Sequence, residues 1–344
     1  MNQYNFTYSS KFHYLCVQNC VSQVLNYLGH CNAHHYINCA IEFCVTPQYG
    51  ITDYIPFVHK KMSEIVIAPI NHSVQLKTVV SSRNAWRINK EILDKNNIFI
   101  AIVDVYYLSY RKEFRKIHGA HAVIVTGYQA DKDLVTIYDW YEPYFYEGNI
   151  SLDEFFAARS SSNPKDDNPY SGWPIYNKWI EITPSFTEYP KAECLYINIR
   201  KSLSNNIYRN NEKGRVLRGV DALTYILQTT SNQSISHNFW RSLHNDMFSI
   251  SRLFSLLLSN FSEMVHEYNW LIEDLEFLES YNIIFQEMLY VILKSSIKGS
   301  SRLTERFQLT LCQFIKKTSS LYSRFERICN DLAFNNFLPP TNMV

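Results

Sequence analysis

The sequence predicts an α+β fold in two parts, and three observations lead to this prediction. The chain has 344 residues, of which 46% are hydrophobic and 19% charged, a composition that suits a globular protein with a sizeable core. Residues 1–190 mix short helical and strand-like segments with Pro, Gly and Asn. Residues 215–335 show helical spacing and few helix breakers. We therefore expect a mixed N-terminal part and a helical C-terminal part.

The first element is a helix predicted at Cys16–Leu28. Gly29 follows it, at a position where glycine commonly ends a helix. Cys16 opens this helix, and Cys20 lies one turn further along the same helix face. The apolar face consists of Val17, Val21, Val24, Leu25 and Leu28.

Strands are predicted in the middle of the chain. Residues 97–110 are rich in β-branched and aromatic side chains, which are typical of strands. Residues 120–141 predict a hairpin, in which the arms AVIVTGY and LVTIYDWY are joined by the turn ADKD. Residues 176–184 predict one further strand.

Helices dominate the rest of the sequence. A short helix at 150–161 is expected to begin with a capping box, formed by Ser151 and Glu154. The stretch 202–214 is polar, so we expect it to be exposed at the boundary between the two parts. After it, three or four long antiparallel helices are predicted from the segments 219–230, 238–261, 264–296 and 302–334.

Charge and cysteine spacing limit the possible functions. The net charge is +1, which gives no general argument for binding to nucleic acid or to an anionic membrane. The N-terminus lacks the pattern of a signal peptide, and no apolar run reaches about 18 residues. We therefore expect a cytoplasmic protein whose eight cysteines are reduced. Because no C-x-x-C pair is present, we predict neither a metal site nor a cofactor of the protein's own.

A nucleophile and its base can be proposed from the helix and the hairpin. A helix N-terminus stabilises a thiolate and this effect fades within one turn, so Cys16 is the better nucleophile and Cys20 is expected in the core. His121 begins one arm of the hairpin and Asp139 ends the other, where Asp139 can orient the His121 base. The alternatives are a structural thiol at Cys16, a surface carboxylate at Asp139, and His118 as the base.

Several of these segments resemble known enzymes. A Cys on the first helix, a His on a strand and an Asp on the next strand resemble papain-like cysteine enzymes. The 13-residue step from Cys16 to Gly29 is similar to double-glycine leader peptidases. The closer resemblance is to the family of the butirosin-pathway acyltransferase, and the amide-forming, cysteine-protease-like enzyme of the closthioamide pathway is similar too. The motifs that carry this resemblance are VDVYYLSY (103–110), IHGAHAVIVTGY (117–128), VTIYDWY (135–141) and GNISLDEFFAAR (148–159).

The resemblance implies a papain-like catalytic domain at residues 1–195 and a helical domain at residues 196–344. It implies that Cys16, His121 and Asp139 form the catalytic triad of an acyltransferase. This enzyme would move an acyl or peptidyl group from the phosphopantetheine thioester of a carrier protein to a small amine, forming an amide. The product would be an antibiotic or another specialised metabolite, such as a nonribosomal peptide. The alternatives are a papain-like peptidase or amidase, and a binding protein without turnover.

The oxyanion and carrier sites are less clearly marked in the sequence. Papain-like peptidases have a Gln shortly before the Cys, but Ser10 lies six residues before Cys16. The Cys16 N–H with His13 or Gln18 would then hold the oxyanion. Asp104 ends a buried strand, where it either caps structure or binds a substrate amine. The basic stretch YRKEFRK (110–116) is either a solvated loop or a dock for an acidic carrier protein. Substrate or carrier binding is assigned to Gln18, Asp104, Tyr106, Arg111, Lys112, Arg115 and Lys116.

Overall fold

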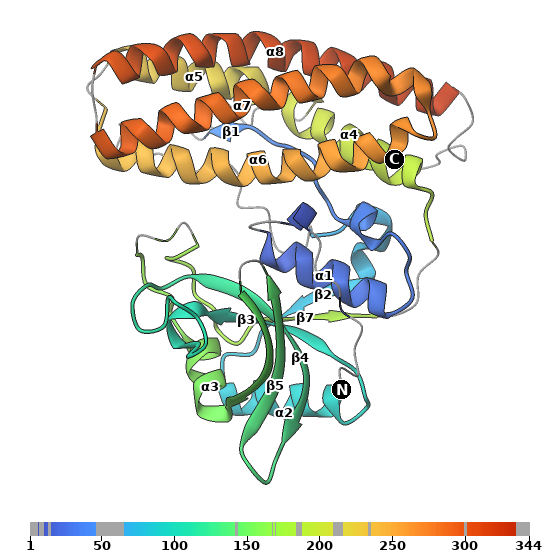
Figure 1. The fold of residues 1–344 in the computed structure, drawn as a ribbon, viewed down its shortest axis with the longest axis vertical. Helices are drawn as coiled ribbons and strands as arrows, with labels where there is room; N and C mark the ends of the chain where they lie inside the picture. Colours follow the sequence, from blue (N-terminus) through green and yellow to red (C-terminus); the bar gives the residue numbers. More distant parts are fainter. Residues whose placement is uncertain are drawn as a thin grey trace. The chain divides into compact units, whose positions relative to one another are not determined.

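The structure is a computed structural model, in which the chain forms two compact units (Figure 1). The first unit comprises Met1–Ile37 and Lys61–Glu188, and the second comprises Asn38–Lys60 and Tyr189–Val344. The expected boundary at 195/196 thus falls inside the second unit, which also takes a segment from the N-terminal half. The structure describes residues 6, 10–12, 15–45, 65–141, 144–166, 168, 170–183, 188–208, 216–232, 235–298 and 301–334.

A six-stranded antiparallel sheet forms the centre of the first unit, with the strand order β2-β7-β3-β4-β5-β6. This sheet, together with the helices of the same unit, confirms the prediction of a mixed N-terminal part. The strands are β2 (Val74–Lys77), β3 (Phe99–Asp104), β4 (Ala120–Gln129), β5 (Leu134–Tyr141), β6 (Tyr144–Ser151) and β7 (Trp179–Ile182).

The hairpin predicted at 120–141 is confirmed as β4 and β5, with Ile124 paired to Tyr138. Strand β3 ends earlier than predicted. The reason is local: the carboxylate of Asp104 accepts a hydrogen bond from the Tyr106 N–H and starts a 3₁₀ turn. Strand β6 was not predicted, because its sequence YFYEGNIS contains Glu, Gly and Asn, which are unfavourable in strands.

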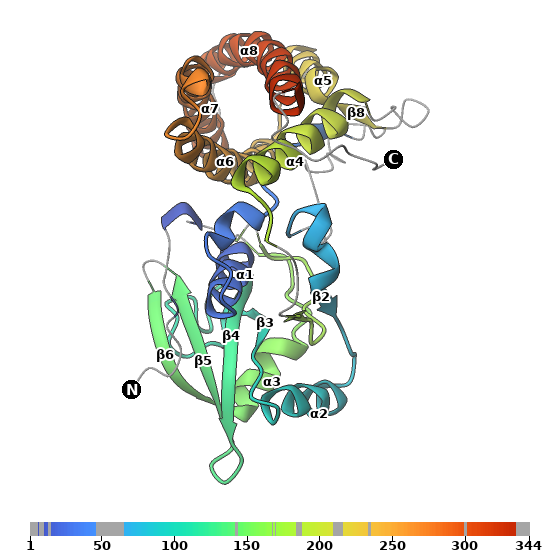
Figure 2. The same ribbon diagram turned by 90° about the vertical axis from the view of Figure 1, so that its right-hand side faces the viewer.

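The α-helices in the described part of the first unit are α1 (Cys16–Tyr27), α2 (Ser82–Leu93) and α3 (Leu152–Ser160). Helices α2 and α3 lie together on one side of the sheet, and α1 contacts β4 at the other end of the unit (Figure 2). Alternate residues of β3, β4 and β5 form a core with α2 and α3, which includes Val103, Val123, Val125, Ile137, Phe155 and Ala158.

The start of α3 fits the predicted capping box only in part. The Ser151 hydroxyl accepts a hydrogen bond from the Glu154 N–H at 3.1 Å, as expected of an N-cap. The Glu154 carboxylate is used elsewhere, because it accepts bonds from the N–H and the hydroxyl of Ser109, at 2.8 and 3.0 Å. The same glutamate therefore ties α3 to the loop that follows β3.

The second unit is helical, as predicted. Four of its helices match the predicted segments, whereas α4 was not predicted. The helices are α4 (Lys191–Leu203), α5 (Gly219–Asn232), α6 (His237–Val265), α7 (Ile272–Lys298) and α8 (Ser301–Phe334). Within the described parts of the chain, we find no helix with both the length and the apolar character needed to cross a membrane.

The polar stretch 202–214 was expected to be exposed, and this is wrong for Ser202 and Asn206, which are 0% and 7% exposed. Both lie on the helical face of Asn198, because residues four apart share a face. The side-chain oxygens of these three residues accept hydrogen bonds from backbone N–H groups, in the pairs Asn198–Cys39 (2.8 Å), Ser202–Ile41 (3.0 Å) and Asn206–Phe43 (2.8 Å). Polar side chains of a helix thus accept the hydrogen bonds of a backbone segment that a neighbouring strand would accept in a sheet.

The segment that receives these bonds also joins the core and the small sheet of the second unit. Phe43 is fully buried and lies near the rings of Phe285 and Phe314, at centroid distances of 6.3 and 5.8 Å. Immediately after it, β1 (Cys44–Val45) pairs antiparallel with β8 (Leu217–Arg218). A short piece of the N-terminal half is therefore an integral part of the helical unit.

Candidate active site

Cys16 is the first residue of α1. The preceding Leu15 has no side-chain acceptor to cap the helix, and the first intrahelical backbone bond runs from the Asn19 N–H to Leu15 O at 2.8 Å. The N–H groups before Asn19 have no acceptor within the helix, and a helix N-terminus favours negative charge. Cys16 is partly exposed, whereas Cys20 is buried and donates its thiol proton to Ala122 O at 3.5 Å.

His121 and Asp139 continue two rows of core residues to the ends of their strands. Because side chains alternate along a strand, His121 shares a face with Val123, and Asp139 shares one with Ile137. Both of these apolar neighbours belong to the core of the unit. His121 Nε2 donates a hydrogen bond to Asp139 Oδ1 at 2.8 Å. This hydrogen bond is shielded from solvent, since His121 and Asp139 are 5% and 1% exposed.

Cys16 and His121 change each other's proton affinity. Burial alone would raise the pKa of Cys16, but the charge and hydrogen bond of His121, with a backbone bond from Ala122, lower it below its usual value. Burial alone would lower the pKa of His121, but Asp139 and Cys16 outweigh burial and raise it to about 9. Burial and the two nearby anions raise the pKa of Cys20 well above its usual value. The arrangement thus favours a thiolate at Cys16 beside an imidazolium at His121.

The second oxygen of Asp139 has partners that the sequence did not reveal. Oδ2 accepts hydrogen bonds from the Tyr110 hydroxyl at 2.9 Å and from Arg111 Nη1 at 3.1 Å. Arg111, which the sequence assigns to substrate or carrier binding, is 8% exposed. Arg111 follows β3 in the chain, and its buried charge is compensated by the Asp139 carboxylate on β5 and by Glu113, whose Oε2 lies 3.4 Å from Arg111 Nε.

Helix α1 is fastened to the strand that carries Asp139. The side-chain amides of Asn19 and Gln23 both donate to Trp140 O, at 2.8 and 3.4 Å. These two residues are one helical turn apart, and Trp140 directly follows Asp139. The two amides therefore set the position of the Cys16 helix relative to the His121–Asp139 pair. The signal in the sequence is a pair of amides one turn apart, on the side of α1 that carries Cys16 and Cys20 and away from its apolar face.

Asp104 is fully buried and uses both carboxylate oxygens within the protein. Oδ1 accepts bonds from the N–H groups of Tyr106 and Gly119, at 3.1 and 3.0 Å. Oδ2 lies 2.7 Å from His118 Nδ1 and accepts a bond from the Ser161 hydroxyl at 2.6 Å. Of the two roles expected for Asp104, this arrangement favours the structural cap over the binding of an amine. His118 also stacks on Tyr106, with ring centroids 4.1 Å apart.

The two N–H groups held by Asp104 close the ends of one loop, residues 105–119, which we call the cationic loop. Its exposed positive side chains are Lys112, Arg115 and Lys116. Backbone hydrogen bonds within the loop, such as Arg115 N–H to Tyr106 O at 2.8 Å, fold it into consecutive turns. The loop therefore presents three cations outward and the Arg111 guanidinium inward.

Gln18 and His13 are the two side chains expected to help hold the oxyanion. Gln18 is half-buried in the first turn of α1, two residues after Cys16. His13 lies outside the described residues.

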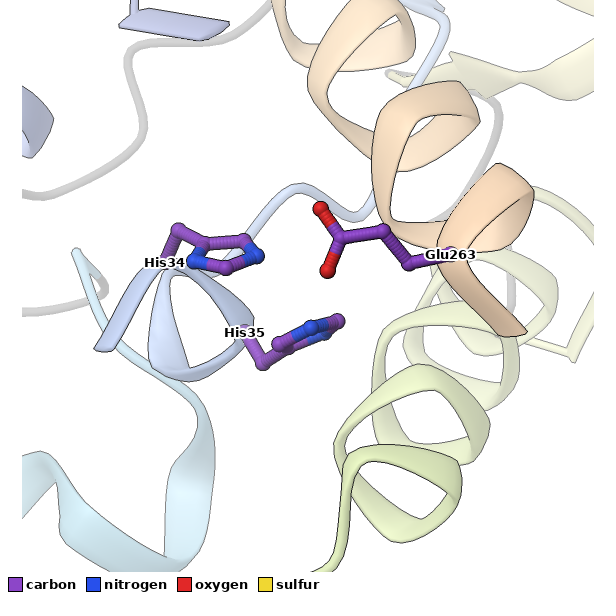
Figure 3. A group of neighbouring side chains, drawn as sticks. All are labelled: His34, His35 and Glu263. Carbon is purple, nitrogen blue, oxygen red and sulfur yellow. The ribbon is translucent and has the colours of Figure 1, made fainter. Parts of the chain in front are cut away.

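The adjacent histidines His34 and His35 lie on the 3₁₀ helix Ala33–Tyr36 of the first unit. Figure 3 shows both rings, together with Glu263, which belongs to α6 of the second unit. The imidazole rings of the two histidines lie against each other, with centroids 4.2 Å apart and planes tilted by 38°. His34 Nε2 is also 3.0 Å from Lys11 Nζ.

Comparison with known proteins covers the same part of the chain as this site. Residues 16–140 match the family described as butirosin biosynthesis protein H, N-terminal. A relative from Niallia circulans is 26% identical over 104 residues, covering 27% of this chain and 34% of its own length. It is ribostamycin:4-(gamma-L-glutamylamino)-(S)-2-hydroxybutanoyl-[BtrI acyl-carrier protein] 4-(gamma-L-glutamylamino)-(S)-2-hydroxybutanoate transferase. The resemblance to the family of the butirosin-pathway acyltransferase is therefore confirmed for residues 16–140, which match the N-terminal domain of that family.

Proposed function

We propose that this protein is an acyltransferase that takes an acyl or peptidyl group from a carrier-protein thioester and forms an amide with an amine, in specialised-metabolite or antibiotic biosynthesis. The observation that carries the proposal is the contact of Cys16, at a helix start, with the buried His121–Asp139 pair. The same arrangement of one helix and two neighbouring strands supports a papain-like fold for the first unit. A reduced thiol is required, so we place the protein in the cytoplasm.

The first half-reaction is thiol exchange. The Cys16 thiolate attacks the thioester carbonyl, and the bond between that carbon and the pantetheine sulfur breaks. The His121 imidazolium gives its proton to the departing sulfur. The products are an acyl-enzyme, a free pantetheine thiol and a neutral imidazole.

The second half-reaction restores the enzyme. An amine attacks the acyl carbon, His121 takes the amine proton, and the bond to the Cys16 sulfur breaks. Cys16 leaves as a thiolate beside a protonated His121, which is the starting pair. Asp139 orients the imidazole throughout. If water replaces the amine, the acyl group is hydrolysed instead.

The oxyanion would be held at the start of α1. The Cys16 N–H is one donor, since no intrahelical bond uses it. The Gln18 side chain, two residues further on, is the second candidate. A thioester is already activated, so it requires less oxyanion stabilisation than a peptide bond, and this favours acyl transfer over peptide hydrolysis.

The carrier protein would dock on the cationic loop. Lys112, Arg115 and Lys116 are exposed there, and the loop also reaches Asp139 through Arg111. Exposed cations attract an acidic protein surface or the phosphate of phosphopantetheine. Tyr106, which is partly exposed on the same loop, would contact the pantetheine arm.

Intact-protein mass spectrometry with an acyl-pantetheine thioester tests the reaction. We expect an acyl adduct on the wild-type protein and none on Cys16→Ser, whereas Cys20→Ser, the matched control, keeps the adduct. Addition of a primary amine should discharge the adduct as an amide. Discharge by water alone would support the alternative, a papain-like peptidase or amidase. A folded protein without any adduct on Cys16 would contradict both enzyme functions.

Charge reversal tests the dock separately. We expect the triple variant Lys112→Glu/Arg115→Glu/Lys116→Glu to lose acylation from a carrier-protein thioester while acylation from a free pantetheine thioester is kept. The matched control, Lys95→Glu/Lys132→Glu, changes two exposed lysines elsewhere in the first unit and should behave as wild type. Equal losses with both donors would contradict docking at the loop.

A further inference from the structure

We propose that Tyr110 and Arg111 are positioning residues of this site: together they clamp the second oxygen of Asp139, and the Arg111 cation helps His121 to give up its proton once Cys16 carries an acyl group. The kinetic part of this inference rests on the proposed function. The part that concerns the charge at His121 does not, and it is tested separately below.

The clamp joins two buried residues, Asp139 and Arg111, to the partly exposed Tyr110. Asp139 Oδ1 accepts from His121 at 2.8 Å, and Oδ2 accepts from Tyr110 at 2.9 Å and from Arg111 at 3.1 Å. With three donors on two oxygens, the carboxylate cannot rotate without breaking a bond. Tyr110 is itself fixed by stacking on Tyr146 of β6, with centroids 3.9 Å apart and planes at 8°. Burial and the adjacent Asp139 raise the pKa of the Tyr110 hydroxyl well above its usual value, so it remains a donor.

The loop that carries the clamp is held firmly at its base. Asp104 binds the N–H groups of Tyr106 and Gly119, near the two ends of the cationic loop. Between them, the Arg111 N–H donates to Leu108 O at 3.0 Å. The backbone that carries Arg111 is therefore fixed by hydrogen bonds, and this fixes the position of the guanidinium beside Asp139.

Three charged groups act on His121, each from a different element. Asp139 on β5 and the Cys16 thiolate on α1 favour the imidazolium, and Arg111 on the cationic loop opposes it. Glu113 lies beyond the guanidinium, with its Oε2 3.4 Å from Arg111 Nε, and moderates this cation. The neighbouring Tyr110 and Cys20 stay uncharged, because burial and nearby anions raise the pKa of each.

Acylation changes this balance in the direction that the second half-reaction requires. A thioester at Cys16 carries no charge, so one of the two anions that hold the proton on His121 disappears. The Arg111 cation, which disfavours the imidazolium, is then balanced by Asp139 alone. The pKa of His121 falls, and a neutral imidazole becomes available to deprotonate the amine. Without the cation, the remaining pair with Asp139 would hold the proton too strongly.

An NMR titration of His121 tests the charge. The background is Cys16→Ser, which removes the thiolate as acylation does. We expect a higher His121 pKa with Arg111→Gln, and a value close to that of the parent with Arg111→Lys, because Lys retains the charge. If Arg111→Gln does not fold, Arg111→Met supplies a second neutral side chain of similar length. An unchanged His121 pKa with a neutral residue at 111 would overturn this part of the inference, whether or not the protein transfers acyl groups.

Single-turnover kinetics test the role in the reaction. Arg111→Gln should slow aminolysis of the acyl-enzyme by about tenfold or more, within the share of catalysis that a positioned base supplies. Acylation of Cys16 should change much less, and the pH profile of aminolysis should move to higher pH. Arg111→Lys should restore most of the rate. If Arg111→Gln and Arg111→Lys slow acylation and aminolysis equally, Arg111 has a structural role and the kinetic part of the inference is wrong.

Tyr110→Phe tests the other half of the clamp. It removes one hydrogen bond to Asp139 Oδ2 and keeps the ring that stacks on Tyr146. We expect slower aminolysis, with a smaller change in the His121 titration than Arg111→Gln produces. Wild-type rates in this variant would exclude Tyr110 as a positioning residue. If wild-type Cys16 is not acylated at all, the proposed function fails, and the NMR titration still decides the inference about Arg111.

Discussion

At the scale of single residues, the imidazole of His121 lies between a carboxylate, a thiol and a nearby guanidinium, all within the first unit. This placement gives different pKa values to Cys16 and Cys20, two cysteines that share one helix face. Cys16 lies at the helix start beside His121, which lowers its pKa, whereas Cys20 is buried and its thiol donates a hydrogen bond to the Ala122 carbonyl. Two thiols one helical turn apart therefore have pKa values shifted in opposite directions.

We expect iodoacetamide to label Cys16 at mildly acidic pH, because His121 lowers the pKa of this thiol. Labelling should decline only when the pH falls below the lowered pKa. Cys20 should stay unlabelled, because its pKa is raised and its side chain is buried. Peptide mapping by mass spectrometry measures both, with the exposed Cys31 as internal reference. Labelling of Cys20 with Cys16 untouched would contradict the assignment of the nucleophile.

Replacing Asp139 should affect the same thiol at a distance. Asp139→Asn removes the charge that raises the pKa of His121, so the imidazolium that stabilises the Cys16 thiolate is weakened. We expect acyl transfer to fall by about 10²–10⁴-fold, the range for a misplaced general base. Asp133→Asn, in the exposed β4–β5 turn, is the matched control. Rates close to wild type in the Asp139 variant would exclude its orienting role.

At the scale of elements, the site depends on how one helix is fixed to one hairpin. The amides of Asn19 and Gln23 share a single acceptor, Trp140 O, next to Asp139. This fastening is directional, so it sets the position of Cys16 more narrowly than apolar packing of α1 could.

Loss of this fastening should reduce activity more than it reduces stability. Asn19→Leu/Gln23→Leu leaves the Trp140 carbonyl without its two donors, and we expect a loss of about 1–3 kcal/mol in the free energy of unfolding. Because α1 is then free to shift, Cys16 acylation should fall further than this destabilisation explains. Denaturant unfolding and the acylation rate measure the two effects. A destabilised variant with wild-type acylation would show that the amides do not position Cys16.

The hairpin and its polar ends could be predicted because local information fixes them. Alternation along 120–141 and a short turn set the register, and the register brings His121 and Asp139 together. Tyr110 and Arg111 could not be found in this way, because their partner lies on another strand and their own loop has no periodicity. The same holds for Asn198, whose acceptor role depends on a segment 159 residues away.

At the scale of the whole molecule, the division into units does not follow the order of the chain. The second unit includes Asn38–Lys60, although the residues on either side of this segment belong to the first. Its described part is bound through the side chains on one face of α4 and through the apolar neighbours of Phe43. The helical unit is thus incomplete without a segment from the N-terminal half.

A fragment of residues 189–344 should therefore fold poorly. It lacks Ile41 and Phe43, so Ser202 of α4 and Asn206 of the π-helical turn after it lose their backbone donors, and the core loses a buried aromatic ring. We expect lower helicity and thermal stability than the second unit shows in the full chain, by circular dichroism. Addition of a peptide spanning 38–45 should restore part of both. A fragment that is as stable as the full chain would contradict this account.

Within the full chain, Asn206→Leu should have a related effect. Asn206 accepts from the Phe43 N–H and donates to Ile41 O, so its loss leaves two buried backbone groups without partners, at a cost of about 2 kcal/mol or more. Ser204→Ala, at an exposed neighbouring position, is the control. Thermal unfolding of the two variants distinguishes them.

The shared segment also fixes an order of events during synthesis. The backbone of Cys39 leaves the ribosome 159 residues before Asn198, its partner in the helical unit. Until α4 has been made, the N–H groups of this stretch and the ring of Phe43 have no native partners. The helical unit therefore cannot complete its folding until α4 and the helices after it have been translated. The segment 38–45 is made first and forms its native contacts only then.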